Sequence, residues 1–205
     1  AVEKDFVGAQ YRLGVMLEEG RGINKDDVAA FSLFKKAADK GNVDARYHLG
    51  LLYQAGRGVQ RDPVQAFNIF TEAAQSGHPL SEAMLGFMYE KGVGTGRDYV
   101  KASQWYEKAA RQGVADAQYN LANLYARGDG VPKSYSEALV WYTKAAEQNN
   151  SLAAYNIGAM FEYGLGVKAD RQKALEWFGR SESLGNRNAE KMLSTLAPGN
   201  QKDAK

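Results

Sequence analysis

The sequence contains no cysteine among its 205 residues. Disulfide bonds and thiolate chemistry are therefore excluded. It also has no apolar run approaching the roughly 18 residues that a membrane-spanning helix requires, and no apolar signal core near its start. We expect no membrane span. Cytosol and bacterial periplasm both remain open as compartments, and we favour the periplasm or secretion.

An excess of one charge is missing as well. The chain has 26 Lys and Arg against 24 Asp and Glu, a formal net charge of +2, and both signs are spread along it. This balance leaves no basic footprint for nucleic acid, so we do not expect nucleic-acid binding. Only two histidines are present, and neither His48 nor His78 has a carboxylate pair at ligand spacing. We expect no metal site and no cofactor.

Catalytic motifs are equally scarce. No G-x-S-x-G occurs, and although Ser32 and Lys35 match S-x-x-K, the S-D-N and K-T-G partners of a penicillin-recognising site are absent. We therefore predict that the protein is not an enzyme. The alternative that stays open is a small-ligand or beta-lactam-binding protein with weak enzymatic activity.

What the sequence has instead is a 36-residue repeat. Small residues recur at this interval without insertion or deletion, at Ala9, Ala45, Ser81, Ala117, Ala153 and Ala189. A second series follows the same interval at Gly14, Gly50, Gly86, Ala122 and Gly158. The register gives five units, near residues 9–44, 45–80, 81–116, 117–152 and 153–188. Such a period predicts a solenoid, in which each unit buries its apolar face against its neighbours.

Each unit has the pattern of two helices, which we name helix A and helix B. In residues 45–80, Tyr47, Leu49, Leu52 and Tyr53 have the spacing of one helix face, which predicts helix A. The two glycines of residues 56–58 allow a tight reversal at its end. Helix B is expected to begin at Pro63, with Asp62 as its N-cap. We predict positive φ at Gly56, Gly128 and Gly164.

The two ends of the chain differ from the repeat. Residues 1–4 align with residues 37–40, which suggests the end of an earlier helix B; a mature N-terminus after signal cleavage or an N-terminal capping turn stays possible. At the other end, residues 189–197 are expected to form a capping helix. Residues 198–205 are too polar to order themselves, so we expect a disordered tail. The prediction is one domain over residues 1–197.

Three features of the repeat carry a family resemblance. Leu49-Gly50-x-x-Tyr53 and Leu85-Gly86-x-x-Tyr89 share a first pattern, and aromatic pairs follow in the predicted B helices, at Trp105-Tyr106, Trp141-Tyr142 and Trp177-Phe178. Ala109-Ala110 and Ala145-Ala146 come next. The chain resembles the Sel-one-like repeat (SLR) family, a relative of the tetratricopeptide repeat. The resemblance implies an all-α, right-handed α-α superhelical solenoid. Because the chain has no cysteine, the branch of the family whose repeats are joined by disulfide bonds is not a close model.

The resemblance also implies a function. In such proteins the concave face, lined mostly by the A helices, commonly binds proteins or peptides. We therefore expect a monomeric, non-enzymatic scaffold that binds a protein or an extended peptide on this face. A bacterial envelope adaptor, a regulator and an effector-immunity protein are the forms that the resemblance favours.

By analogy with this family, four positions of helix A line the groove. They are counted from the Leu of the Leu-Gly pattern, such as Leu49: two residues before it, one residue before it, two residues after it and five residues after it. The residues expected there are Tyr11, Tyr47, His48, Met84, Phe87, Tyr119, Asn120, Asn123, Tyr155 and Asn156. Aromatic residues and Met are enriched at protein interfaces. The alternative is that the tyrosines pack between helices and expose only their hydroxyls.

Two of these residues suggest how a segment is held. An asparagine amide both donates and accepts, so Asn123 and Asn156 can complement a peptide backbone. This is similar to the tetratricopeptide clamp for C-terminal peptides. However, Tyr119, Asn188 and Met192 stand where that clamp has its cations. We therefore expect an internal extended segment instead of a free carboxylate.

Overall fold

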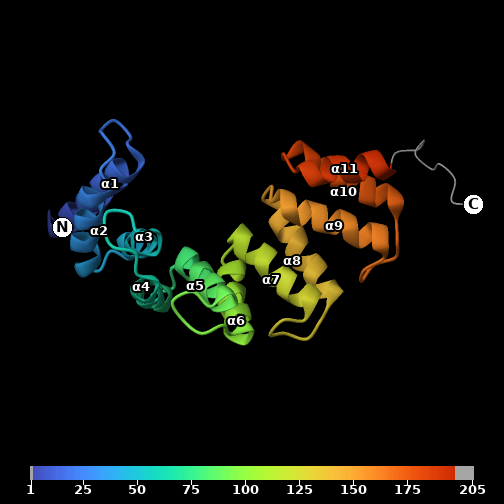
Figure 1. The fold of residues 1–205 in the computed structure, drawn as a ribbon, viewed down its shortest axis with the longest axis horizontal. Helices are drawn as coiled ribbons and strands as arrows, with labels where there is room; N and C mark the ends of the chain where they lie inside the picture. Colours follow the sequence, from blue (N-terminus) through green and yellow to red (C-terminus); the bar gives the residue numbers. More distant parts are fainter. Residues whose placement is uncertain (1, 197–205) are drawn as a thin grey trace, which may run out of the picture. The chain divides into compact units, whose positions relative to one another are not determined.

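The computed structural model describes residues 2–196, with side chains from Phe6 onward. Within this range the chain consists of eleven helices joined by turns, with no β-strand (Figure 1). The all-α prediction of repeated helix-turn-helix units is confirmed. The chain divides into two compact units, Ala1–Lys108 and Ala109–Lys205.

The first unit begins with repeat one. Odd-numbered helices are the A helices, and even-numbered helices are the B helices. From α1 to α5, each helix packs against the next one in the chain. The helices are α1 (Val2–Glu19), α2 (Asp27–Asp39), α3 (Val43–Ala55), α4 (Pro63–Gln75), α5 (Pro79–Lys91) and α6 (Tyr99–Arg111), of which the last residues belong to the second unit.

The second unit continues the same order. Its helices are α7 (Ala115–Arg127), α8 (Tyr135–Glu147), α9 (Ser151–Tyr163), α10 (Arg171–Ser183) and α11 (Arg187–Leu196). Helix α11 packs against α10, and Leu196 is buried there beside the partly buried Met192 and Leu193. The tail predicted to be disordered lies outside the described residues.

The helix ends follow the predicted local chemistry. The side chain of Asp62 accepts hydrogen bonds from the amides of Val64 and Gln65, and Pro63 takes the first helical position of α4. Gly56, Gly128 and Gly164 end their A helices with φ of 70°, 82° and 68°. Because these interactions are made within a few residues, the sequence alone specifies where each helix begins and ends.

The N-terminal prediction is wrong in one respect. Val2–Glu19 is a single unbroken helix, so residues 2–4 do not close an earlier helix B before a turn. The position that carries a left-handed glycine in the next repeat, Gly41 with φ 87°, is Asp5 here. Without a glycine to reverse the chain, the helix continues.

The outer face of α1 differs from that of later A helices. Leu13 and Met16 are each 41% exposed, whereas their counterparts Leu49 and Leu52 in α3 are 7% and 0% exposed. In α3 these residues belong to a core cluster that includes buried residues of α2, and α1 has no preceding helix B among the described residues. Within the described part of the chain, Leu13 and Met16 therefore stay exposed.

Glycine in the middle of helix A has a packing role. A Cβ added at Gly50 would lie 2.7 Å from the ring of Phe70 in α4, and one at Gly86 would lie 2.5 Å from the ring of Tyr106. Real Cβ atoms do not approach so closely. The missing side chain therefore lets helix A lie directly against the buried aromatic of helix B.

This contact predicts the cost of a single methyl group. Gly50→Ala is expected to lower the free energy of unfolding by about 1–2 kcal/mol, because the ring of Phe70 must shift in a packed core. Gly8→Ala on α1 is the control, since nothing lies within 4 Å of its added Cβ. That variant should gain up to about 1 kcal/mol from helix propensity. Urea denaturation of both variants tests this, and equal effects would contradict the packing argument.

Candidate functional site

The ten residues predicted to line the groove all lie on A helices, and each is partly buried. In the first unit they are Tyr11, Tyr47, His48, Met84 and Phe87. In the second unit they are Tyr119, Asn120, Asn123, Tyr155 and Asn156. At a half-buried position, one part of the side chain packs inside the protein and the other part is available to a partner. The role of these ten residues in binding stays a prediction.

The tyrosines have a packing role. Tyr47 lies 6.0 Å from Phe70 between ring centroids, Tyr119 lies 5.9 Å from Tyr142, and Tyr155 lies 5.3 Å from Phe178. Each ring therefore leans on the buried aromatic of helix B in its own repeat. One side of each ring therefore packs inside the protein, as the alternative of tyrosines packed between helices expects.

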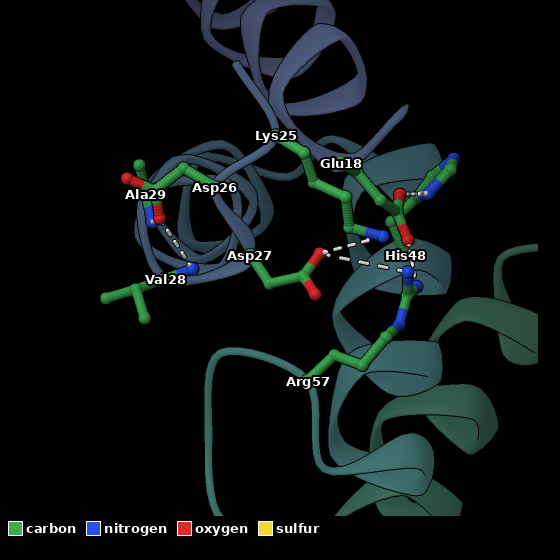
Figure 2. A network of polar contacts seen from close by, with 8 residues as sticks. All are labelled: Glu18, Lys25, Asp26, Asp27, Val28, Ala29, His48 and Arg57. Atoms are coloured by element: carbon green, nitrogen blue, oxygen red, sulfur yellow. Dashed lines mark hydrogen bonds and ion pairs between the residues drawn. The ribbon is translucent and has the colours of Figure 1, made fainter. Parts of the chain in front are cut away.

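His48 is held inside the first unit. Its ring stacks on Phe34 at 4.8 Å, and its Nδ1–H donates to Oε2 of Glu18 at 2.7 Å. Arg57 donates to the other carboxylate oxygen of Glu18 and lies 3.8 Å from Asp27, as Figure 2 shows. His48 thus joins repeats one and two, and this nitrogen is not free for a partner.

The Glu18 carboxylate is the centre of this network. Burial alone would raise the pKa of Glu18, but the hydrogen bonds and charges of His48 and Arg57 outweigh it, so the pKa lies below its ordinary value. This position, five after the Leu of helix A, is one of the four expected to line the groove, but none of its residues was predicted as a contact. The signal was present, because Glu18, Glu90 and Glu162 share it at multiples of the 36-residue period.

A shallow pocket of about 390 Å³ lies on α1. The pocket is lined by Tyr11, Arg12, Val15, Met16 and Arg21. The first three of these residues occupy three of the four positions predicted to line the groove. Arg12 is exposed and forms no ion pair with any described residue. The pocket therefore combines apolar surface with an available cation.

In the second unit the two predicted asparagines contact each other. The hydroxyl of Tyr142, whose pKa is raised by burial, donates to Oδ1 of Asn123 at 2.6 Å. The same oxygen accepts from Nδ2 of Asn156 at 3.5 Å. Nδ2 of Asn123 and Oδ1 of Asn156 form no hydrogen bond with the described residues. The pair therefore presents one donor group and one acceptor.

The remaining chemical candidates do not assemble into a site. His78 caps α5, where its Nδ1 accepts from the amide of Ser81 at 3.2 Å. Ser32 and Lys35 are both exposed on α2. Among residues 2–196, no three histidine or acidic side chains gather as metal ligands, and no helix is both long and apolar enough to cross a membrane.

The repeat architecture has direct counterparts. The family model described as Sel1 repeat matches residues 7–42, 43–78, 79–114, 115–150 and 151–186. Each match begins two residues before the unit that we set from the sequence register. Each also contains one helix A and one helix B, as in α3 and α4 for residues 43–78. No curated protein matches the sequence.

Solved structures agree with this match. The protective antigen c5321 of uropathogenic Escherichia coli, which displays an SLR fold, is 34% identical with a TM-score of 0.89, over 95% of this chain and 42% of that one. This chain therefore spans well under half of that antigen. A Sel1 repeat protein from Oxalobacter formigenes is 35% identical with a TM-score of 0.88, over 95% and 80%.

A more distant likeness comes from a third bacterium. The immunity protein Pa5087 from Pseudomonas aeruginosa is 26% identical with a TM-score of 0.60, over 95% of this chain and 72% of that one. Sel1 repeats are typical of non-catalytic scaffolds that bind proteins. With the repeat matched over five consecutive units and the helices in the same order, this chain belongs to the Sel1 repeat family.

Proposed function

We propose that this protein is a non-enzymatic scaffold that binds an extended segment of a partner protein along the half-buried faces of its A helices. The observation that carries the proposal is the Asn123–Asn156 pair, in which Tyr142 fixes the Asn123 oxygen and one donor group and one acceptor have no partner among the described residues. A peptide unit offers the complementary acceptor and donor. The neighbouring rings of Tyr119 and Tyr155 add apolar contact.

The surface on α1 supports the same function in the first unit. Its pocket presents Tyr11, Val15 and Met16 as apolar contacts beside Arg12, which pairs with no acidic side chain among the described residues. Mixed apolar and arginine surfaces are typical of protein interfaces. An apolar side chain of the partner is expected to enter this pocket.

The biological setting is bacterial in this proposal. The likeness to an immunity protein supports neutralisation of a secreted effector as one form of the function. An envelope adaptor and a regulator are the other two forms. All three forms of the function require a surface that binds another protein.

Asn156→Ala tests the pair and keeps the Tyr142–Asn123 bond, although Tyr142 loses its interaction with the Asn156 side chain. We expect this variant to bind the partner more weakly by about 1–3 kcal/mol, since a buried group of the partner loses its acceptor. Asn188→Ala, on the exposed surface of α11, is the matched control and should bind as the wild type does.

The experiment is a pull-down from a bacterial lysate with the three chains, quantified by mass spectrometry and followed by calorimetry with the recovered partner. A protein recovered by the wild type and Asn188→Ala but depleted with Asn156→Ala supports the proposal. Full affinity of Asn156→Ala would discard the asparagine pair as a contact. If no chain recovers a partner, the scaffold proposal itself is contradicted.

A further inference from the structure

Glu162, near the end of α9, has an unusual environment for a carboxylate. Its Oε2 is sealed from solvent and has no hydrogen-bond partner among the described residues. An ionised carboxylate in such a place is unfavourable unless a donor or a cation meets it. The fold therefore leaves one acceptor unused on the face of helix A.

The two acidic residues at the same position of other repeats are both paired. Glu18 accepts from His48 and Arg57, one at each oxygen. Glu90 accepts from the hydroxyl of Tyr106 at 2.9 Å and from Lys91 at 2.8 Å. This position of the repeat is thus one at which a carboxylate is normally met by donors.

The sequence explains why Glu162 lacks them. One period on from Tyr142, and two from Tyr106, stands Phe178, which has no hydroxyl. At the position that His48 holds relative to Glu18, the chain has Met192, which has no N–H. Phe178 and Met192 belong to one apolar cluster. The counterparts of Tyr106 and His48 are therefore apolar, while the carboxylate was kept. The counterpart of Lys91 is Tyr163, and that of Arg57 is Gln201, which lies outside the described residues.

We propose that Glu162 binds an arginine side chain of the partner segment, which deepens the proposed function and rests on it. The pair of Glu18 and Arg57 shows that this position accommodates a guanidinium. Because Oε2 is sealed from solvent, the Glu162 side chain must turn outward to meet the partner. A guanidinium can then donate two parallel N–H groups to the two carboxylate oxygens, which a lysine cannot do. The missing donor is thereby supplied from outside the chain.

The spacing along α9 places this contact relative to the asparagine pair. Glu162 follows Asn156 by six residues, which corresponds to roughly 9 Å of helix rise and roughly 120° of rotation about the helix axis. An extended peptide needs about three residues to cover the rise alone. The partner segment therefore carries its arginine at least about three residues from the peptide unit held by Asn156.

A selection experiment tests the assignment without knowledge of the natural partner. A random dodecapeptide library displayed on phage is selected on the full chain, on Glu162→Gln and on Glu176→Gln. Glu176 is an exposed residue of α10, so the last variant removes the same charge elsewhere. Arginine is expected to be enriched at one position with the wild type and Glu176→Gln, and not with Glu162→Gln.

Individual selected peptides then give the magnitude. Their affinity should fall about 10- to 100-fold with Glu162→Gln, as for the loss of hydrogen bonds to a charged group. Replacing the arginine by citrulline should cause a similar loss. The thermal midpoint of Glu162→Gln should be unchanged or higher, because no internal partner is lost; a lower midpoint would overturn the proposal.

The outcomes separate this inference from the proposed function. Peptides that bind without arginine enrichment, and that still depend on Asn156, would overturn the assignment of Glu162 and leave the scaffold intact. If the library yields no binding peptide, the extended-segment function fails together with it. A chain without residues 198–205 should select peptides with the same arginine. If arginine enrichment appears only after this deletion, the tail occupies Glu162 in the full chain, and the proposal is overturned.

Discussion

Gly58→Ala is expected to lower the free energy of unfolding by about 2–5 kcal/mol. Two causes add. Gly58 has φ of +67°, which an alanine adopts only at a cost, and its added Cβ would lie 2.1 Å from the carbonyl oxygen of Asp27. Because that atom belongs to the backbone of α2, it cannot turn aside as a side chain can.

Gly22→Ala is the matched control. Gly22 occupies the same turn position one repeat earlier, with φ of +71°, but the nearest atom to its added Cβ is the Cε of Met16 at 4.0 Å. This variant should therefore show only the backbone cost, about 1–2 kcal/mol. Urea denaturation of both variants measures the difference. Equal losses would show that the approach of the turn to α2 does not limit stability.

The same approach recurs along the chain. An added Cβ at Gly94 would meet the carbonyl oxygen of Pro63 at 2.1 Å, and one at Gly166 would meet the Cβ of Tyr135 at 2.5 Å. In each case the second glycine of the turn touches the start of helix B in the preceding repeat. The paired glycines thus serve two purposes: the first ends helix A, and the second lets consecutive repeats stack.

Glu18→Gln is expected to lower the free energy of unfolding by about 2–3 kcal/mol at pH 7, because charge-assisted hydrogen bonds to His48 and Arg57 are lost. Glu19→Gln is the control. Glu19 pairs with Arg21 on the surface, where such an ion pair contributes at most about 1 kcal/mol. Comparable losses in the two variants would mean that the network around Glu18 does not stabilise the fold.

The pH dependence of the Glu18 effect has a definite sign. The pKa of Glu18 in the folded chain lies below its ordinary value of 4.5, so folding favours the ionised form. The resulting stabilisation is fully present above pH 4.5 and is lost as the pH falls through the folded pKa. Unfolding free energies of wild type and Glu18→Gln should therefore converge in acid. A gap that stays constant would exclude Glu18 as the titrating group.

The helices were predictable because their ends are determined locally. Asp62 caps α4 through amides two and three residues away, and the glycine that ends α3 needs only its own φ. The failure at the N-terminus has the same origin. Four residues resembled the end of a helix B, but Asp5 stands where the reversing glycine is required, so the helix continues.

The register placed the ten candidate residues on the A helices, but it could not give their interactions, and their role in binding stays a prediction. Ten residues were placed on the A helices by register, and all ten are partly buried there. The register could not show that Asn123 gives its oxygen to Tyr142, or that His48 binds Glu18. Such pairs depend on the distance and rotation between two helices, which a periodic pattern does not specify.

The sequence by itself determined the repeat, the helices, their caps and the left-handed turns, because each depends on residues close together in the chain. Only the tertiary structure decided which polar groups are paired. Glu18 meets His48 and Arg57 across 30 and 39 residues, while Glu162, at the same position of its repeat, meets no described donor. The difference arises because a hydrogen bond requires a donor within about 3 Å, and packing brings donors to Glu18 and none from the described residues to Oε2 of Glu162.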